Sequence, residues 1–420
     1  GSLLPRFESW LKMLDLSRSR ILTGFGPGSF EYVYNTNSVS YLKYAHNAPL
    51  QILVELGLPG LIIVLAAAFT GVRAIIRNFY FTRTPQKKVL VTSLLTGITA
   101  FLLHNLADFD IYNFELAAAF ILILAVLMSQ VTIGLIEIKK IKLTYLLGLN
   151  PGKRRSIVFA AVLMVTLLSA VTAGKFTPVL SLIYVFIAVM AAIWSVSKED
   201  LRSTNLDLPV LFLIIMSAVS LTYTPDLHSG IKYFMLFISA AAVLYFYSQF
   251  LRRYTFKIIT ANFLIWSGVI LSVIAISQAI YRQVTHWQGG FYADAFFPNS
   301  NIFACYIVIP FGFLFSRVLF ERKISLLWLK IAGLFLIIAA LGLARSKAGS
   351  LQLILVSAGL WLQYARGMES IKDTESRRAL KSRVIKSVFA FALITAFTPL
   401  FPSGMKMLSA GSDTYLLNRP

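Results

Sequence analysis

Long apolar blocks dominate this chain and decide what it can fold into. Most run for about 16–22 residues, enough for a helix to cross a hydrocarbon core of about 30 Å. Lipid offers the backbone no hydrogen-bond partners, and the blocks lack the alternation of barrel strands, so each is predicted to be a helix. About twelve such segments are present, at residues 58–76, 89–106, 114–134, 156–173, 179–195, 208–222, 231–250, 258–280, 301–319, 324–343, 350–365 and 384–400. The sequence therefore predicts an all-α polytopic membrane protein.

Composition excludes the main alternative, a soluble enzyme. Of the 420 residues, 57% are hydrophobic and 14% charged, whereas soluble domains have about 45–50% and roughly 25%. Lys and Arg outnumber Asp and Glu by 39 to 18. These cations lie between apolar blocks, so the lipid bilayer is the expected partner and nucleic acid is not. Cys305 is the only cysteine and lies in an apolar block, which excludes an intrachain disulfide and a cysteine-based metal site.

The distribution of the cations predicts the orientation in the membrane. Lys and Arg cluster in every second loop, most densely in residues 139–155 and 366–386, and the positive-inside rule places those loops in the cytoplasm. Both termini and all four histidines then map to the periplasmic or extracellular side, called here the outer side. The predicted parts are an outer segment 1–57, three spans in 58–138, a basic cytoplasmic linker 139–155, nine spans in 156–400 and an outer segment 401–420. No apolar signal-peptide region is visible in residues 1–47.

The outer segment contains a histidine in front of a predicted helix. Asn47 is a suitable N-cap and Pro49 is tolerated in a first helical turn, so we predict that a helix begins just after His46. Helix N-termini favour anions, and a neutral imidazole there could take a proton from an incoming hydroxyl group, with Glu55 orienting the site. A histidine before a helix is also a common capping or hydrogen-bonding residue, and both interpretations stay open.

A glycine-rich run, residues 24–30, lies in the same segment and includes Gly24, Gly26 and Gly28. At first sight it is similar to a phosphate cradle. It lacks the Lys-Ser/Thr of a P-loop and the flanking strand of a dinucleotide-binding fold. The simpler interpretation is a tight turn whose glycines adopt backbone angles that other residues avoid.

Two cations, Arg345 and Lys347, lie where the predicted helix 324–343 emerges on the outer side. The outer loops are otherwise poor in cations, and this pair would suit a doubly charged phosphate. Interfacial cations also commonly extend toward lipid headgroups. The sequence leaves both roles open.

Carboxylates are scarce on the predicted outer side. Asp108 and Asp110 follow His104 and could hold a divalent cation, with Asp226 and Asp294 as further candidates on distant helices. Few other carboxylates could complete an octahedral oxygen shell, so we expect no metal site.

Polar and aromatic residues complete the outer candidates. Pro298 and Asn299 most simply mark the start of a helix, and a sugar contact by Asn299 or Asn301 is the alternative. Trp10 is interpreted as a residue of the membrane interface or as a ring that stacks on a sugar.

Several of these features together are similar to a known family. His46-Asn47, followed after nine residues by Gly57-Leu58-Pro59-Gly60, resembles the signature of the O-antigen ligase and O-antigen polymerase superfamily. Further features that match in kind are Arg6 to Trp10, Gly24 to Phe30, His104 to Asp110, Pro298-Asn299 and Arg345-Ser346.

The resemblance implies a GT-C-like glycosyltransferase of the bacterial inner membrane with a large periplasmic loop. Its members transfer a glycan from an undecaprenyl-pyrophosphate-linked donor to a hydroxyl group of a glycolipid or glycan acceptor, without a metal or another cofactor. By this resemblance His46 is the general base, and Arg345 with one or both of Arg6 and Arg419 holds the pyrophosphate. Supporting residues would be Asn47, Glu55, Gly24, Gly26 and Gly28.

The motifs stand in a different order from that of the family. There the Arg-Ser helix end precedes the loop with the His-Asn motif, whereas here residues 1–138 carry the His part and residues 153–420 the Arg-Ser part. Joining Pro420 to Gly1 would restore the family order. We therefore predict a circular permutation, with the active site under a loop formed by residues 401–420 and 1–47.

Within this superfamily the sequence leaves the acceptor open. A ligase acting on lipid A-core, an O-antigen or exopolysaccharide polymerase, and a protein O-oligosaccharyltransferase all fit. Outside the class, a multi-pass transporter is the alternative, although transporters usually carry ionisable groups near the midplane and internal repeats, and the sequence shows neither.

Overall fold

The computed structural model divides the chain into two compact units, residues 1–264 and 265–420, which we describe separately. The residues it describes are 3–38, 41–81, 98, 102, 105, 134–136, 201–203, 206–250, 254–285, 294–297, 300–320, 326–367, 382, 384–386, 388 and 390. The predicted linker 139–155, the predicted spans at 156–173 and 179–195, and the segment 401–420 lie outside these residues.

Long apolar helices make up most of what is described. Four are long and apolar enough to cross a membrane: Ala48–Arg73, Ile258–Val284, Ser300–Leu319 and Leu327–Ala344. Asp207–Ser220 and Gly349–Leu362 are shorter apolar helices. The prediction of an α-helical polytopic membrane protein is thereby confirmed. The total of twelve spans and the GT-C-like arrangement stay predictions.

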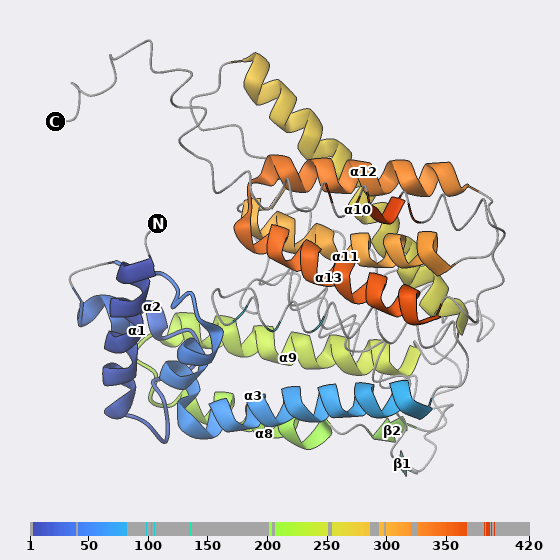
Figure 1. Cartoon of the computed structure of the whole chain (residues 1–420). Helices are drawn as coiled ribbons and strands as arrows, with labels where there is room; N and C mark the ends of the chain where they lie inside the picture. Colours follow the sequence, from blue (N-terminus) through green and yellow to red (C-terminus); the bar gives the residue numbers. More distant parts are fainter. Residues whose placement is uncertain are drawn as a thin grey trace, which may run out of the picture. The chain divides into compact units, whose positions relative to one another are not determined.

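The first unit is built around one long helix. It contains α1 (Leu3–Arg18), α2 (Phe30–Thr36), α3 (Ala48–Phe81), α8 (Asp207–Ser220) and α9 (Leu227–Phe250). Helix α3 packs against α8, α8 packs against α9, and α1 and α2 both contact α3. Helices α3, α8 and α9 run side by side, and α1 lies across the end where α3 begins (Figure 1).

Helix α3 begins ten residues before the predicted span 58–76 and contains a break. Gly57 has φ +68° and ψ −173°, so the ordinary helix stops there and restarts at the following Leu-Pro-Gly. A proline is tolerated at such a restart because the first amides of a helix have no partner within the helix. The predicted helix start just after His46 is confirmed.

A short pair of strands was not predicted. Residues Gly134–Ile136 (β1) pair antiparallel with Leu201–Ser203 (β2). The sequence predicts a helix end at β1 and a loop at β2. The pairing of segments so far apart in the chain leaves no local periodicity from which strands could be predicted. Both strands adjoin loops predicted to be cytoplasmic.

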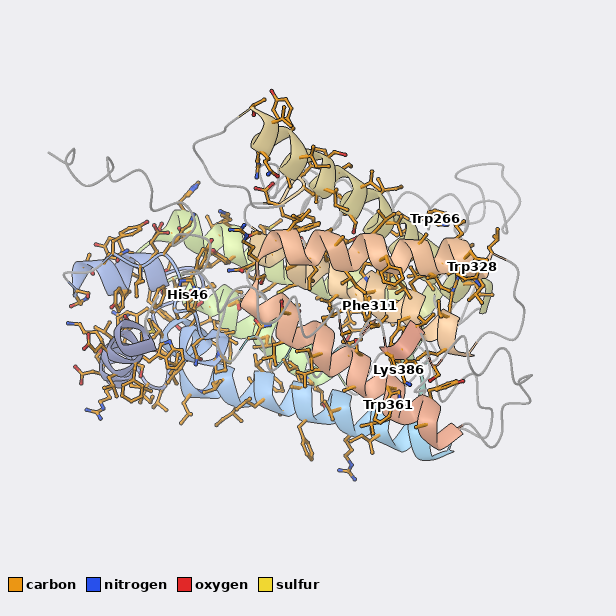
Figure 2. All side chains as sticks on the ribbon, turned by 45° about the horizontal axis from the view of Figure 1, so that its top comes forward. His46, Trp266, Phe311, Trp328, Trp361 and Lys386 are labelled. Carbon is orange, nitrogen blue, oxygen red and sulfur yellow. The ribbon has the colours of Figure 1, made fainter. Side chains whose placement is uncertain are left out.

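The second unit is arranged around α11 (Ser300–Phe320), which contacts both α12 (Leu327–Ala344) and α13 (Lys347–Gly367). Helix α10 (Tyr254–Val284) belongs to this unit from Ile265 onward. A Cβ on Gly268 of α10 would lie 2.3 Å from the Pro310 ring of α11, so only glycine fits there. Phe311 lies inside the unit, whereas the exposed Trp328 and Trp361 lie at its edge (Figure 2).

Candidate active site

The turn that carries His46 connects the short loop after α2 to the start of α3. Asn47 caps α3, because its Oδ1 accepts a hydrogen bond from the Leu50 amide at 3.0 Å. His46 itself is half-buried and has φ +49°, an unusual backbone angle for a residue other than glycine. The predicted N-cap is therefore present, and the imidazole lies beside the first turn of α3 (Figure 2).

Two hydrogen bonds hold the residue before His46. The indole Nε1 of Trp10, from α1, donates to the Ala45 carbonyl at 3.1 Å. The Ala45 amide donates to Oε1 of Gln51 at 3.2 Å. Trp10 is thus neither simply a membrane-interface residue nor a free stacking ring. It ties α1 to the turn that positions His46.

Glu55 is completely buried and acts on this turn through Gln51. The Nε2 of Gln51 donates to Oε1 of Glu55 at 3.1 Å, and Gln51 is also buried. The relay runs from Glu55 through Gln51 to the Ala45 amide, one residue before the imidazole. Sequence reasoning gave Gln51 no role, although its position one helical turn before Glu55 is the spacing at which such pairs meet.

An apolar cluster packs against the same turn. Its buried members come from α1, α2, the turn and α3, and packing this many elements into one core restrains the backbone of the turn. The buried residues are Met13, Phe30, Tyr34, Ala45 and Val54, with Trp10, Leu16, Phe25, Leu42 and Leu50 packed against them.

The glycine-rich run is a tight turn that seals the break in α3. Gly24, Gly26 and Gly28 have φ +65°, +101° and +73°, which confirms the turn interpretation. The amides of Phe25 and Gly26 donate to the Val54 and Glu55 carbonyls at 2.9 and 2.8 Å. Those carbonyls lack helical partners because of the break. These amides are engaged within the protein, so they do not form a phosphate cradle.

Close packing explains why two of these positions need glycine. A Cβ on Gly24 would lie 2.3 Å from the Glu55 carbonyl oxygen, and one on Gly26 would lie 2.6 Å from Cβ of Thr224. The run is therefore wedged between α3 and the loop that joins α8 to α9.

An arginine that sequence reasoning passed over secures this wedge. The Arg20 guanidinium carbon lies 5.1 Å from the centre of the Phe25 ring and 5.9 Å from that of Tyr223. The Tyr223 hydroxyl donates to the Thr23 carbonyl at 2.8 Å. Burial raises the pKa of the Tyr223 phenol, and the positive charge of Arg20 partly offsets this effect.

The two cations predicted at a helix end, Arg345 and Lys347, lie in the second unit. Arg345 is exposed and ends α12 in a left-handed conformation, with φ +51°. Ser346 is buried and its Oγ accepts from the Gly349 amide at 3.2 Å, so it caps α13. The Arg-Ser pair therefore forms the turn between the two helices, as the sequence predicted. Lys347 begins α13.

The remaining candidates divide into two groups. Arg6 lies in α1, one helical turn before Trp10, and Asn301 is exposed in the first turn of α11. Arg419, His104, Asp108, Asp110, Pro298 and Asn299 lie outside the described residues.

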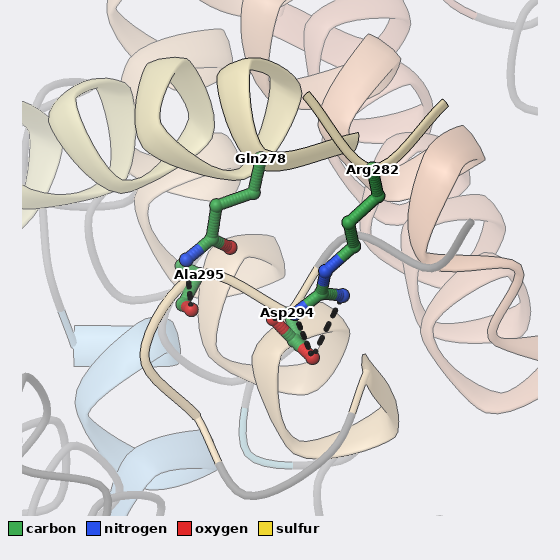
Figure 3. A network of polar contacts seen from close by, with 4 residues as sticks. All are labelled: Gln278, Arg282, Asp294 and Ala295. Atoms are coloured by element: carbon green, nitrogen blue, oxygen red, sulfur yellow. Dashed lines mark hydrogen bonds and ion pairs between the residues drawn. The ribbon is translucent and has the colours of Figure 1, made fainter. Parts of the chain in front are cut away.

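Two carboxylates considered as metal ligands have other roles. Asp226 caps α9, accepting from the Ser229 amide at 3.1 Å, and this hydrogen bonding lowers the pKa of its carboxyl group. Asp294 forms a two-pronged ion pair with Arg282 of α10 at 3.2 Å (Figure 3). Beside it, Nε2 of Gln278 donates to the Ala295 carbonyl at 2.7 Å. Within the described part of the chain, no three His, Cys, Asp or Glu residues gather as a metal site would need.

Comparison with known proteins bears on the segment just described. Residues 1–65 match the family model described as O-antigen ligase. This segment is similar to O-antigen ligases. The match covers α1, the glycine-rich run, α2, the His46 turn and the break in α3, and it confirms the resemblance to the O-antigen ligase superfamily. No curated protein sequence and no solved structure matches the chain.

Proposed function

We propose that this protein is an O-antigen ligase-like glycosyltransferase of the bacterial inner membrane. It moves a glycan from undecaprenyl pyrophosphate to an acceptor hydroxyl group on the periplasmic side, with lipid A-core as the acceptor. The family match to residues 1–65 supports glycosyl transfer in general. The four long apolar helices support a membrane enzyme that meets a lipid-linked donor.

One hydrogen bond supports particular residues for this reaction. Trp10 donates its indole N–H to Ala45, so the helix that contains Arg6 is fastened to the turn that contains His46. A catalytic base and a cation for the leaving group must lie near each other, since the nucleophile attacks the carbon that the pyrophosphate leaves. This fastening supports a shared site for the two residues, because it ties the two segments that contain them together.

In the proposed reaction the chain supplies a base and positive charge. His46 takes the proton of the acceptor hydroxyl as its oxygen attacks the anomeric carbon, and the configuration there inverts. The bond between that carbon and the pyrophosphate oxygen breaks, and Arg345, with one or both of Arg6 and Arg419, stabilises the charge on the departing diphosphate. No metal is required for this step.

The supporting residues keep the base in place. The Glu55–Gln51 relay binds the amide of Ala45, and Trp10 binds its carbonyl. Asn47 caps the start of α3.

The test is transfer of a radiolabelled lipid-linked glycan by purified protein in proteoliposomes, with lipid A-core as the acceptor and electrophoresis as the readout. His46→Ala should reduce transfer at least about a hundredfold, the usual contribution of a general base. His228→Ala is the matched control, since this histidine is exposed beside the α8–α9 loop. Equal transfer by the wild type and His46→Ala would refute the mechanism. If the proteoliposomes moved the lipid-linked glycan across the membrane without any glycosyl transfer, the protein would be a transporter.

A further inference from the structure

Helix α1 presents three distinct faces along its length. Residues Met13, Ser17 and the partly buried Trp10 face the protein core. A second face is apolar but exposed, with Phe7, Leu11 and Leu14 open to the surroundings by 57%, 52% and 41%. We call these three residues the outer apolar strip. Their spacing of four and three residues places them on one side of the helix.

The third face is charged and runs parallel to the outer apolar strip. Glu8, Lys12 and Asp15 are exposed and follow the strip residues by one position each. A helix with a core side, an apolar side and a charged side meets three environments. In a membrane protein those are the protein interior, the acyl chains near the headgroups, and water.

Helix α3 also has an apolar side that is exposed. Leu58, Ile62, Leu65 and Phe69 are exposed by 40%, 55%, 53% and 65% and lie on one side of this candidate span. The Leu58 amide donates to the Ile21 carbonyl at 2.7 Å. Because exposed hydrophobic residues occur on both sides of this contact, the apolar surface passes from the span toward the end of α1.

The orientation of α1 agrees with this continuity. Helix α1 lies across the end of α3 instead of alongside it (Figure 1). A helix that crosses the end of a membrane span lies near the plane of the bilayer surface. Leu22, exposed by 68%, follows α1 close to Leu58 and extends the same surface.

Cations around the strip fit a phospholipid surface. Lys12 and Arg18 are exposed on α1. Long cationic side chains beside an apolar strip reach lipid phosphates while their stems contact the acyl region.

We propose that α1 is an interfacial helix that rests on the outer leaflet of the bilayer through Phe7, Leu11 and Leu14. Trp10 of the same helix holds the Ala45 carbonyl, so this contact also sets the depth of the His46 turn relative to lipid. The inference does not depend on the proposed reaction.

The test measures the depth of spin labels in the full chain, reconstituted in nanodiscs of phosphatidylethanolamine and phosphatidylglycerol. Cys305 is replaced by Ala, and single cysteines are placed at the strip residues (Phe7→Cys, Leu11→Cys, Leu14→Cys). The matched controls are their charged neighbours Glu8→Cys, Lys12→Cys and Asp15→Cys. Strip labels should be accessible to oxygen and protected from a water-soluble nickel chelate, and control labels should show the reverse.

Three results would overturn the proposal. Equal access of the nickel chelate to both sets would place α1 in water. Protection of the strip labels from both reagents would mean that another part of the chain covers the strip. In wild-type protein, which needs no variant to fold, a phospholipid with a photoreactive group below its headgroup should form adducts within residues 7–14, and adducts confined to the spans would also refute it.

Discussion

The hydrogen bond between Trp10 and Ala45 can be tested by removing one donor. Trp10→Phe keeps an aromatic ring in the cluster but leaves the Ala45 carbonyl without this 3.1 Å contact. A hydrogen bond of this kind contributes about 0.5–1.5 kcal/mol net, and a buried acceptor left unpaired costs about 1–3 kcal/mol. Because the bond is partly buried, we expect about 1–1.5 kcal/mol of local destabilisation.

Hydrogen–deuterium exchange followed by mass spectrometry reports this loss directly. Local opening is governed by local free energy, and 1.4 kcal/mol corresponds to a tenfold change. Peptides that cover residues 42–52 should exchange about five- to tenfold faster in Trp10→Phe than in the wild type. The peptide that contains α2 should change less, because its helix is not held by this bond.

Trp266→Phe provides the control for the same chemical change. Trp266 is 54% exposed on α10 and belongs to a different unit, so its replacement should leave exchange in residues 42–52 unchanged. If Trp10→Phe accelerates exchange no more than Trp266→Phe does, the tryptophan does not position the His46 turn.

Three further predictions concern buried and partly buried polar groups. Gln51→Leu removes one hydrogen-bond donor to Glu55 and the acceptor of the Ala45 amide and should cost about 2–4 kcal/mol, measured as a lower urea midpoint in detergent; an unchanged midpoint would contradict the relay. Arg282→Ala should cost only about 0.5–1 kcal/mol, because the ion pair with Asp294 is partly solvated, and high salt should shrink the difference. Asp226 has a lowered pKa, so its stabilisation is present above the unfolded-state pKa and is lost as the pH falls through the folded-state value. Asp226→Asn should therefore flatten the acid side of the thermal stability profile, and an unaltered profile would refute this role.

The sequence determined the parts of this protein that depend on local chemistry. Lipid cannot satisfy backbone polar groups, so uninterrupted apolar blocks had to be helices, and four described spans are of that kind. Asn47 before Ala48 specified a helix start, because an N-cap acts within its own first turn. The glycine-rich run likewise specified a tight turn, since positive φ angles are a local property.

Only the tertiary structure decided how these parts act on one another. Gly57 breaks α3, and the freed carbonyls accept from the glycine-rich run more than twenty residues earlier. Trp10 binds Ala45, which lies 35 residues later in the sequence. Arg20 contacts Tyr223, which lies in the loop between α8 and α9, far away in the sequence. Such contacts depend on which surfaces meet when helices pack, and neither hydrophobic period nor capping preference encodes that meeting. The outer apolar strip is of the same kind, because its spacing is local whereas its exposure follows from which side of α1 the core occupies.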